Sequence, residues 1–137
     1  MKTKTLLTIV AASLLSGLTT PTGYAQDIDS FAPVVVKTVP EAGSKNVPPG
    51  KYEVKITFSK EMADGSWSWS TAWENSTPDF IGQPHYEADG RTCVVKVKLE
   101  PGQTYAFWLN SEKFHNFHDR AGQPAVPYLL IFQTKQK

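Results

Sequence analysis

Apolar and polar residues alternate with a period of two over several short stretches of the chain. In the clearest stretch, 51–58, every second residue is tyrosine, valine, isoleucine or phenylalanine, and the residues between them are charged or threonine. This period places one side of a β-strand in a core and the other in solvent. Similar alternation or β-branched and aromatic runs occur at 34–36, 66–70, 85–88, 91–99, 105–109 and 128–134. The pattern predicts about seven short strands.

After residue 25, nine prolines and seven glycines cluster between these runs. About seven strands separated by such turn residues predict an all-β fold, an Ig-like Greek-key β-sandwich. Asp89-Gly90, between two extended runs, predicts a hairpin in which both turn positions have positive φ. The only helical expectation is one short turn within 110–118, where Phe114 and Phe117 are three residues apart.

The first 25 residues have the pattern of a cleavable secretory signal peptide. Lys2 and Lys4 precede a mostly apolar run at 6–18, and the segment ends in Gly23-Tyr24-Ala25, with small residues at the positions that a signal peptidase reads. An N-terminal membrane anchor is the alternative, but the run is short for a bilayer. We therefore expect a signal peptide at 1–25, a short linker at 26–32 and one domain at 33–137. The domain would be exported, to the periplasm, the cell surface or the medium.

Composition narrows the classes of function. The 137 residues carry 14 basic and 13 acidic side chains, a net charge of +1, which gives no electrostatic reason to expect nucleic acid as a partner. No apolar stretch after the signal could cross a membrane. The single cysteine, Cys93, excludes an internal disulfide. Because Cys93 shares its parity with Val95 and Val97, we expect a buried thiol, with an intermolecular disulfide as the alternative.

A short motif sharpens the sandwich prediction. Leu99-Glu100-Pro101-Gly102 leads into Tyr105. This order is typical of the tyrosine corner of Greek-key sandwiches, in which a tyrosine hydroxyl bonds to backbone a few residues upstream. An ordinary Pro-Gly turn followed by a core tyrosine is the alternative interpretation.

Several segments resemble one known family when they are taken in order. Val39-Pro40-Glu41-Ala42-Gly43 is followed by Val47-Pro48-Pro49, then by Thr57-Phe58-Ser59-Lys60-Glu61-Met62, and finally by Asp119-Arg120-Ala121-Gly122-Gln123-Pro124. Together, over about 33–134, they resemble bacterial Ig-like domains of the S-layer-protein type. Gln123 stands where asparagine is common in that family. The resemblance implies an accessory module of an exported or surface protein. It implies no enzymatic activity and supplies no catalytic residues.

The polar residues offer little catalytic chemistry of their own. His115 and His118, three residues apart and next to Asp119, could present two imidazoles to a metal, but a closed zinc site needs four ligands. We expect solvated loop histidines and no metal or other cofactor. The chain has neither a G-x-S-x-G nor an H-E-x-x-H motif, so we expect no enzyme.

The four tryptophans are the most informative residues for a binding function. We expect Trp67 and Trp69, which share a face at period two, to fill the core, as a tryptophan commonly does in such folds. Trp73 lies beyond that strand, and Trp108 is out of phase with Tyr105 and Phe107, so both are candidates for ligand or partner contact. The first hypothesis is a non-catalytic module that binds an envelope or secreted protein through a sheet face or end loops. The alternative is a carbohydrate-binding module whose exposed tryptophans stack on polysaccharide.

Overall fold

The computed structural model of the chain is built almost entirely of strands. It describes residue 23 and residues 25–137, so the predicted signal peptide lies largely outside the described residues and stays a prediction. The described part contains one 3-10 turn, η1 (Ile28–Ser30), and seven strands. The strands are β1 (Val35–Val39), β2 (Gly50–Phe58), β3 (Trp69–Thr71), β4 (Asp79–Tyr86), β5 (Thr92–Leu99), β6 (Thr104–Leu109) and β7 (Tyr128–Gln133).

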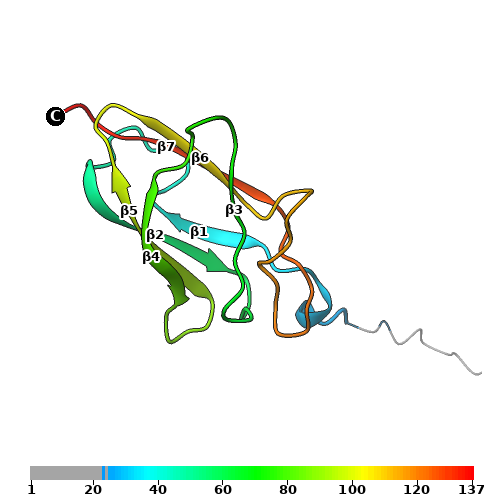
Figure 1. Ribbon diagram of the computed structural model, residues 1–137. Coiled ribbons are helices and arrows are strands. Elements are labelled where there is room, and N and C mark those ends of the chain that lie inside the picture. The colour runs from blue at the N-terminus through cyan, green and yellow to red at the C-terminus, as the bar shows by residue number, and fades with distance from the viewer. Residues whose placement is uncertain (1–22, 24) are drawn as a thin grey trace, which may run out of the picture.

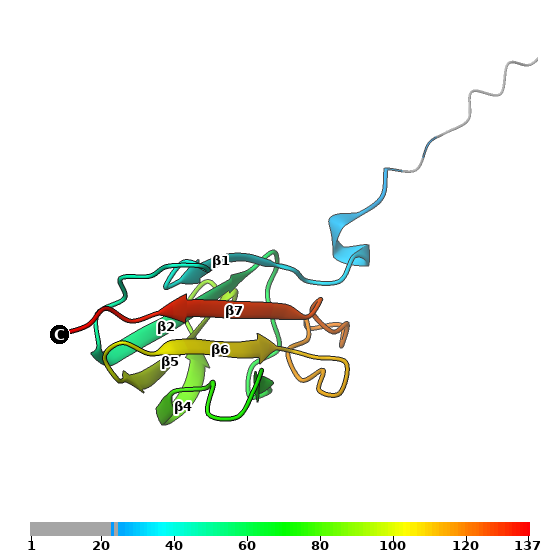
Figure 2. The same ribbon diagram turned by 90° about the horizontal axis from the view of Figure 1, so that it is seen from above.

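The strands form two sheets packed face to face (Figures 1 and 2). One sheet has the order β1-β2-β5-β4 and the other β3-β6-β7, and all neighbouring strands are antiparallel. Figure 2 looks onto the three-stranded sheet, with β6 and β7 in front of β2 and β5. Four strands facing three in this order is the arrangement of constant-type immunoglobulin sandwiches. The predicted fold class is confirmed.

The core lies between the sheets, where the sequence alternation placed it. Val54 and Ile56 of β2 and Val95 and Val97 of β5 have no exposed surface, and Cys93 is also fully buried. The three-stranded sheet contributes larger side chains to the same layer, namely Tyr105, Phe107, Leu109, Leu130 and Phe132. Rings of neighbouring strands in this sheet pack edge to face, as in the pair of Phe107 and Phe132 with centroids 6.4 Å apart.

The tyrosine corner is present. The Glu100 N–H donates to the Tyr105 hydroxyl oxygen over 2.8 Å, across the turn that leads from β5 into β6. Since β5 and β6 belong to different sheets, this bond fixes the point at which the chain changes sheets.

The chain also crosses between sheets after β1. Beyond the cis Val39-Pro40 peptide, the segment 43–47 leaves the four-stranded sheet and runs along β7. The Gly43 N–H donates to the Ile131 carbonyl oxygen (2.7 Å), and the Gln133 N–H donates to the Ser44 carbonyl oxygen (2.7 Å). This segment therefore covers the C-terminal half of the outer edge of β7.

The hairpin prediction is confirmed, but its turn is different from the expected one. β4 and β5 pair, yet only Gly90 has a positive φ (63°) and Asp89 does not. Instead, one carboxylate oxygen of Asp89 accepts the N–H groups of Arg91 and Thr92, and the other accepts the Thr92 hydroxyl. This local bonding by the side chain stabilises a longer turn than the two-residue type.

The expected helical turn within 110–118 is wrong. Asn110 takes a positive φ (56°), which no right-handed helix contains, and the segment runs as an irregular loop between β6 and β7. Phe117 is fully buried while Phe114 is exposed, so their spacing does not reflect a shared helical face. Among the described residues, no helix is long and apolar enough to cross a membrane.

Candidate functional site

The two candidate tryptophans lie on different elements of the three-stranded side. Trp108 belongs to β6 and stands directly opposite Ser70 of β3 and Leu129 of β7. Trp73 lies in the connection after β3, where its backbone N–H donates to Ser76 Oγ (3.1 Å), and its side chain is 47% exposed. No aromatic contact joins the two indoles in the described part of the chain. Each must therefore be considered as its own contact point.

Trp108 is part of a larger apolar surface. It alternates with the inward-facing Phe107 and Leu109, so it points out of the sandwich, and it is partly exposed. By register and alternation, the outward positions of this sheet are Ser70, Thr104, Ala106, Trp108, Leu129, Ile131 and Gln133. None of them is charged. We call the apolar centre of this surface, made by Trp108, Leu129 and Ile131 around the fully buried Ala106, the apolar face.

A cavity of about 440 Å³ lies beside the apolar face. It is lined by the Trp108 indole, by Pro127, and by the polar or charged side chains of Ser111, Glu112 and Lys113. Ser111 Oγ accepts the N–H groups of Lys113 and Phe114 at 3.3 and 3.2 Å, which holds this loop in a tight turn. An aromatic ring next to hydroxyl, carboxylate and ammonium groups can stack on a flat ligand and hydrogen-bond its edge.

Asn110 fixes the loop that carries this cavity. Its side chain is fully buried, and its Nδ2 donates to the carbonyl oxygens of Phe117 (2.8 Å) and Ala125 (3.0 Å). Its Oδ1 accepts the Phe117 N–H (2.9 Å). One side chain thus makes three hydrogen bonds to backbone groups of the irregular loop. These bonds tie both arms of the loop to the end of β6.

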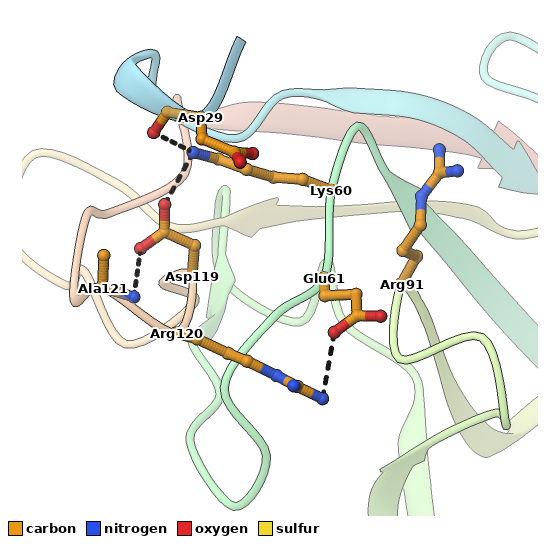
Figure 3. Close-up of a pocket in the computed structure, with 7 residues that line it drawn as sticks. All are labelled: Asp29, Lys60, Glu61, Arg91, Asp119, Arg120 and Ala121. Atoms are coloured by element: carbon orange, nitrogen blue, oxygen red, sulfur yellow. Dashed lines mark hydrogen bonds and ion pairs between the residues drawn. The ribbon is translucent and has the colours of Figure 1, made fainter. Parts of the chain in front are cut away.

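A second, charged cavity of about 520 Å³ lies at the end of the sandwich that η1 covers (Figure 3). Lys60 Nζ pairs with Asp119 Oδ2 (2.7 Å) and donates to the Asp29 carbonyl oxygen (3.0 Å), and Arg120 pairs with Glu61 (3.0 Å). The walls hold three cationic and three anionic side chains, which are Lys60, Arg91, Arg120, Asp29, Glu61 and Asp119. This balance favours a structural network over a site for a charged ligand.

Asp119 is the centre of that network. Burial opposes its ionisation, but Lys60 and the backbone N–H groups of Gln123 and Ala121 outweigh burial and hold the pKa of Asp119 below its ordinary value. The network joins the two loops, 59–62 and 119–124, that carried the family resemblance in the sequence. Its physical role is to lock these loops together beneath η1.

The remaining chemical candidates have structural roles. Trp67 and Trp69 are partly buried and pack against the core, as expected, and Trp69 contacts Phe107 and Phe117. Burial raises the pKa of the Cys93 thiol to about 12, so the thiol stays protonated and unreactive.

The histidines do not assemble a metal site. His115 is exposed and bonds to the Glu112 carbonyl oxygen, while His118 bonds to the carbonyl oxygen of Asp119. The carboxylate of Asp119 is already engaged with Lys60. Among the described residues, no group of three or more histidine, cysteine, aspartate or glutamate side chains could hold a metal.

The comparison with protein families agrees with this architecture. A family model described as bacterial Ig-like domain matches residues 29–134. The chain belongs to the bacterial Ig-like domain family. This confirms the resemblance seen in the ordered segments of the sequence. No curated protein matches the chain.

Solved structures of an S-layer protein contain the same fold. The chain is similar to the crystal structure of the S-layer protein rSbsC(31-844) and to the structure of surface layer protein SbsC, domains 1–6. Each match has a TM-score of 0.52 and 16% identity, and covers 78% of this chain. The chain spans only 14% of each of those chains. At this identity the likeness shows the fold alone.

The sequence pattern found Trp108 but missed the surface around it. Leu129 and Ile131 flank the inward-facing Leu130, and three consecutive apolar residues show no alternation. Only the register with β6, which sets Leu129 opposite Trp108 and Ile131 opposite Ala106, reveals that they share one face. Tracing the parity back from Phe132, which is buried, could have found them.

Proposed function

We propose that this chain is an exported, non-catalytic accessory module that binds a partner protein at the cell surface or in the periplasm. The binding surface in this proposal is the apolar face. The observation that carries it is the absence of charge from all seven outward positions of the three-stranded sheet, with Trp108, Leu129 and Ile131 at least partly exposed. A solvated sheet face normally carries polar side chains, and an apolar one marks a surface that another molecule covers.

The chemistry of the surface favours a protein as the partner. Trp108 supplies a large, rigid ring, and the aliphatic side chains of Leu129 and Ile131 lie on its β7 side. Interface cores have this composition, because aromatic anchors with aliphatic neighbours release much water and lose little side-chain entropy on binding. Membership of a bacterial Ig-like family supports the accessory role.

The test is capture of proteins from a native envelope extract by matched variants of the chain. We expect the double variant Trp108→Ser, Leu129→Ser to lose the bound protein that the parent retains. The control, Lys51→Ser with Lys96→Ser, changes two outward residues of the other sheet and should retain it. Circular dichroism establishes that both variants are folded. Equal retention by the two double variants would contradict the proposal.

The cavity beside Trp108 favours a second candidate, binding of polysaccharide. Its indole can stack on a sugar ring while Ser111, Glu112 and Lys113 bond to hydroxyl groups. Here Glu112→Ala should weaken binding to envelope polysaccharide, whereas Leu129→Ser should leave it unchanged. A protein interface on the apolar face predicts the opposite order, so the two variants discriminate between the candidates.

A further inference from the structure

Sheet edges are a second way to bind a protein, because an edge strand offers unpaired N–H and C=O groups. Two edges here are irregular. β4 is interrupted between Ile81 and His85, with Gly82 and Pro84 inside it, and β1 has a shift in register between Val35 and Lys37. β3 is only three residues long. Bulges, prolines and short length are the usual protections against added strands. β7 differs, since its six residues pair with β6 without a break.

The hydrogen bonds of β7 show which groups of this edge are open. The Thr134 N–H donates to the Gln103 carbonyl oxygen, whereas the Gln133 N–H donates to Ser44 in the covering segment. Since bonding direction alternates along an antiparallel strand, the odd-numbered residues of β7 point away from β6. The Ile131 carbonyl oxygen is taken by Gly43. The N–H and C=O of Leu129 and the N–H of Ile131 have no hydrogen-bond partner within the described residues.

A recess lies beside these open groups. β1 and β7 run side by side (Figure 2), and they are joined at one end by the bond from the Val126 N–H to the Pro33 carbonyl oxygen and at the other by that from Gly43 to Ile131. Near them is a cavity of about 460 Å³ whose walls include both apolar and polar side chains. It is lined by Val35, Val36, Lys37, Thr38, Glu41, Ala42 and Tyr128.

We propose that β7 accepts an extended segment of the partner protein as an added strand beside Leu129 and Ile131. The inference rests on the proposed protein-binding function and states how the partner would bind. Open backbone groups select an extended peptide as the ligand, since main-chain bonds give the affinity in strand addition. Alternate side chains of the peptide would enter the cavity beside Val35, Val36 and Tyr128, and the others would extend the apolar face.

The recess determines the kind of occupant. It is closed at both ends, by Pro33 with Val126 and by Gly43 with Ile131. Between these ends only Leu129 and Ile131 offer open backbone groups, which matches a short extended segment entering from the side better than the long edge strand of a second folded copy. A short segment with alternating apolar residues therefore fits best.

The experiment selects binders from a displayed library of short random peptides against the full chain and then tests them on variants. Ile131→Pro removes the open N–H and no bond of the β6–β7 ladder, and proline is tolerated on an edge strand with that orientation. We expect it to weaken the selected peptides about tenfold, the effect of one lost main-chain bond together with local misfit. Ile131→Val keeps the N–H and should bind as the parent does.

A second variant addresses the cavity without touching β7. Ala42→Leu places a larger side chain in the recess from the crossing segment, and it should also weaken the peptides. In the parent, amide hydrogen exchange of Leu129 and Ile131 should slow when peptide is bound. Failure to select any peptide, or peptides indifferent to Ile131→Pro and to Ala42→Leu, would overturn strand addition.

Other outcomes separate this inference from the function on which it rests. Peptides that lose binding in Trp108→Ser but not in Ile131→Pro would refute strand addition and still support the apolar face. Dimers that form with rising concentration and disappear in Ile131→Pro would show that a second copy of the chain binds the β7 edge. That result would overturn the peptide proposal. Retention of envelope protein by both double variants described above would instead remove the proposed function itself.

Discussion

The two sheets of this domain share one core but differ sharply on their outer faces. Outward positions of the four-stranded sheet carry seven charged residues, which are Lys37, Lys51, Glu53, Lys55, Asp79, Lys96 and Lys98. Neighbouring strands there set Glu53 opposite Lys96, in the manner of a solvated face. The outward positions of the three-stranded sheet carry no charge and place Trp108 opposite Leu129.

The contrast teaches where to look for function in a fold without catalytic residues. Both faces belong to antiparallel sheets that share one core, so the fold does not require one of them to be apolar. Charge on the larger sheet keeps it in water, whereas the apolar face exposes a tryptophan and an isoleucine to water at a cost in solubility. That difference is the reason for proposing a partner on the smaller sheet.

The largest expected loss of stability comes from removing the side-chain bonds that support the loop beside Trp108. Asn110→Ala removes three side-chain bonds and leaves the Phe117 N–H and the Ala125 carbonyl oxygen without a partner, and we expect the free energy of unfolding to fall by about 3 kcal/mol. Urea denaturation measures it. Asn75→Ala is the matched control, because Asn75 also has a positive φ (62°) but is exposed. Equal losses in the two variants would show that backbone strain alone explains the effect.

A smaller effect should come from the corner that starts the three-stranded sheet. Tyr105→Phe removes the bond from the Glu100 N–H, and we expect a loss of about 1 kcal/mol in the free energy of unfolding. Tyr128→Phe on the neighbouring strand is the control, since its hydroxyl makes no hydrogen bond to the described residues. If both variants unfold alike, the corner does not contribute as assigned.

Acid should weaken the network at the η1 end. The pKa of Asp119 in the folded protein lies below its ordinary value of 3.8, so its contribution is present above that value and is lost as pH falls through the folded pKa. We expect Asp119→Asn to flatten this acid-induced loss of stability, because the variant side chain does not titrate. Thermal unfolding between pH 5 and pH 2, over about three units, measures it. An unchanged slope in the variant would contradict the assignment.

The smallest effects on stability should be those of the outer faces themselves. Ile131→Thr and Lys96→Thr each alter one outward residue, and both should change the free energy of unfolding by about 0.5 kcal/mol or less. They should differ in surface hydrophobicity, because only the first removes apolar surface. Earlier elution from a phenyl column by Ile131→Thr alone is the expected result, and identical elution of the two variants would show that the faces do not differ as described.

The sequence predicted the fold well because alternation on β2 and β5 is clean. Val54, Ile56, Val95 and Val97 are inward, as their period required, and the Leu99–Tyr105 motif forms a true tyrosine corner. Such signals are local, so they survive without knowledge of the tertiary structure.

The candidate site was only half predictable. The phase of Trp108 marked it as outward, but its neighbours come from β7, and their register with β6 is set by long-range pairing. The helical turn predicted within the β6–β7 loop was wrong for a different reason. Asn110 adopts a left-handed conformation and replaces helical bonds with side-chain bonds, and no periodicity in Phe114 or Phe117 could reveal this.

Site-specific photo-crosslinking in the native bacterium tests the central claim most directly. A benzoylphenylalanine replaces either Ile131, on the apolar face, or Lys96, on the charged face, and the cells are irradiated. If a partner protein covers the apolar face, position 131 forms a discrete crosslinked product and position 96 does not. A product from position 96 alone, or none from position 131 in cells that contain the folded domain, would contradict this account.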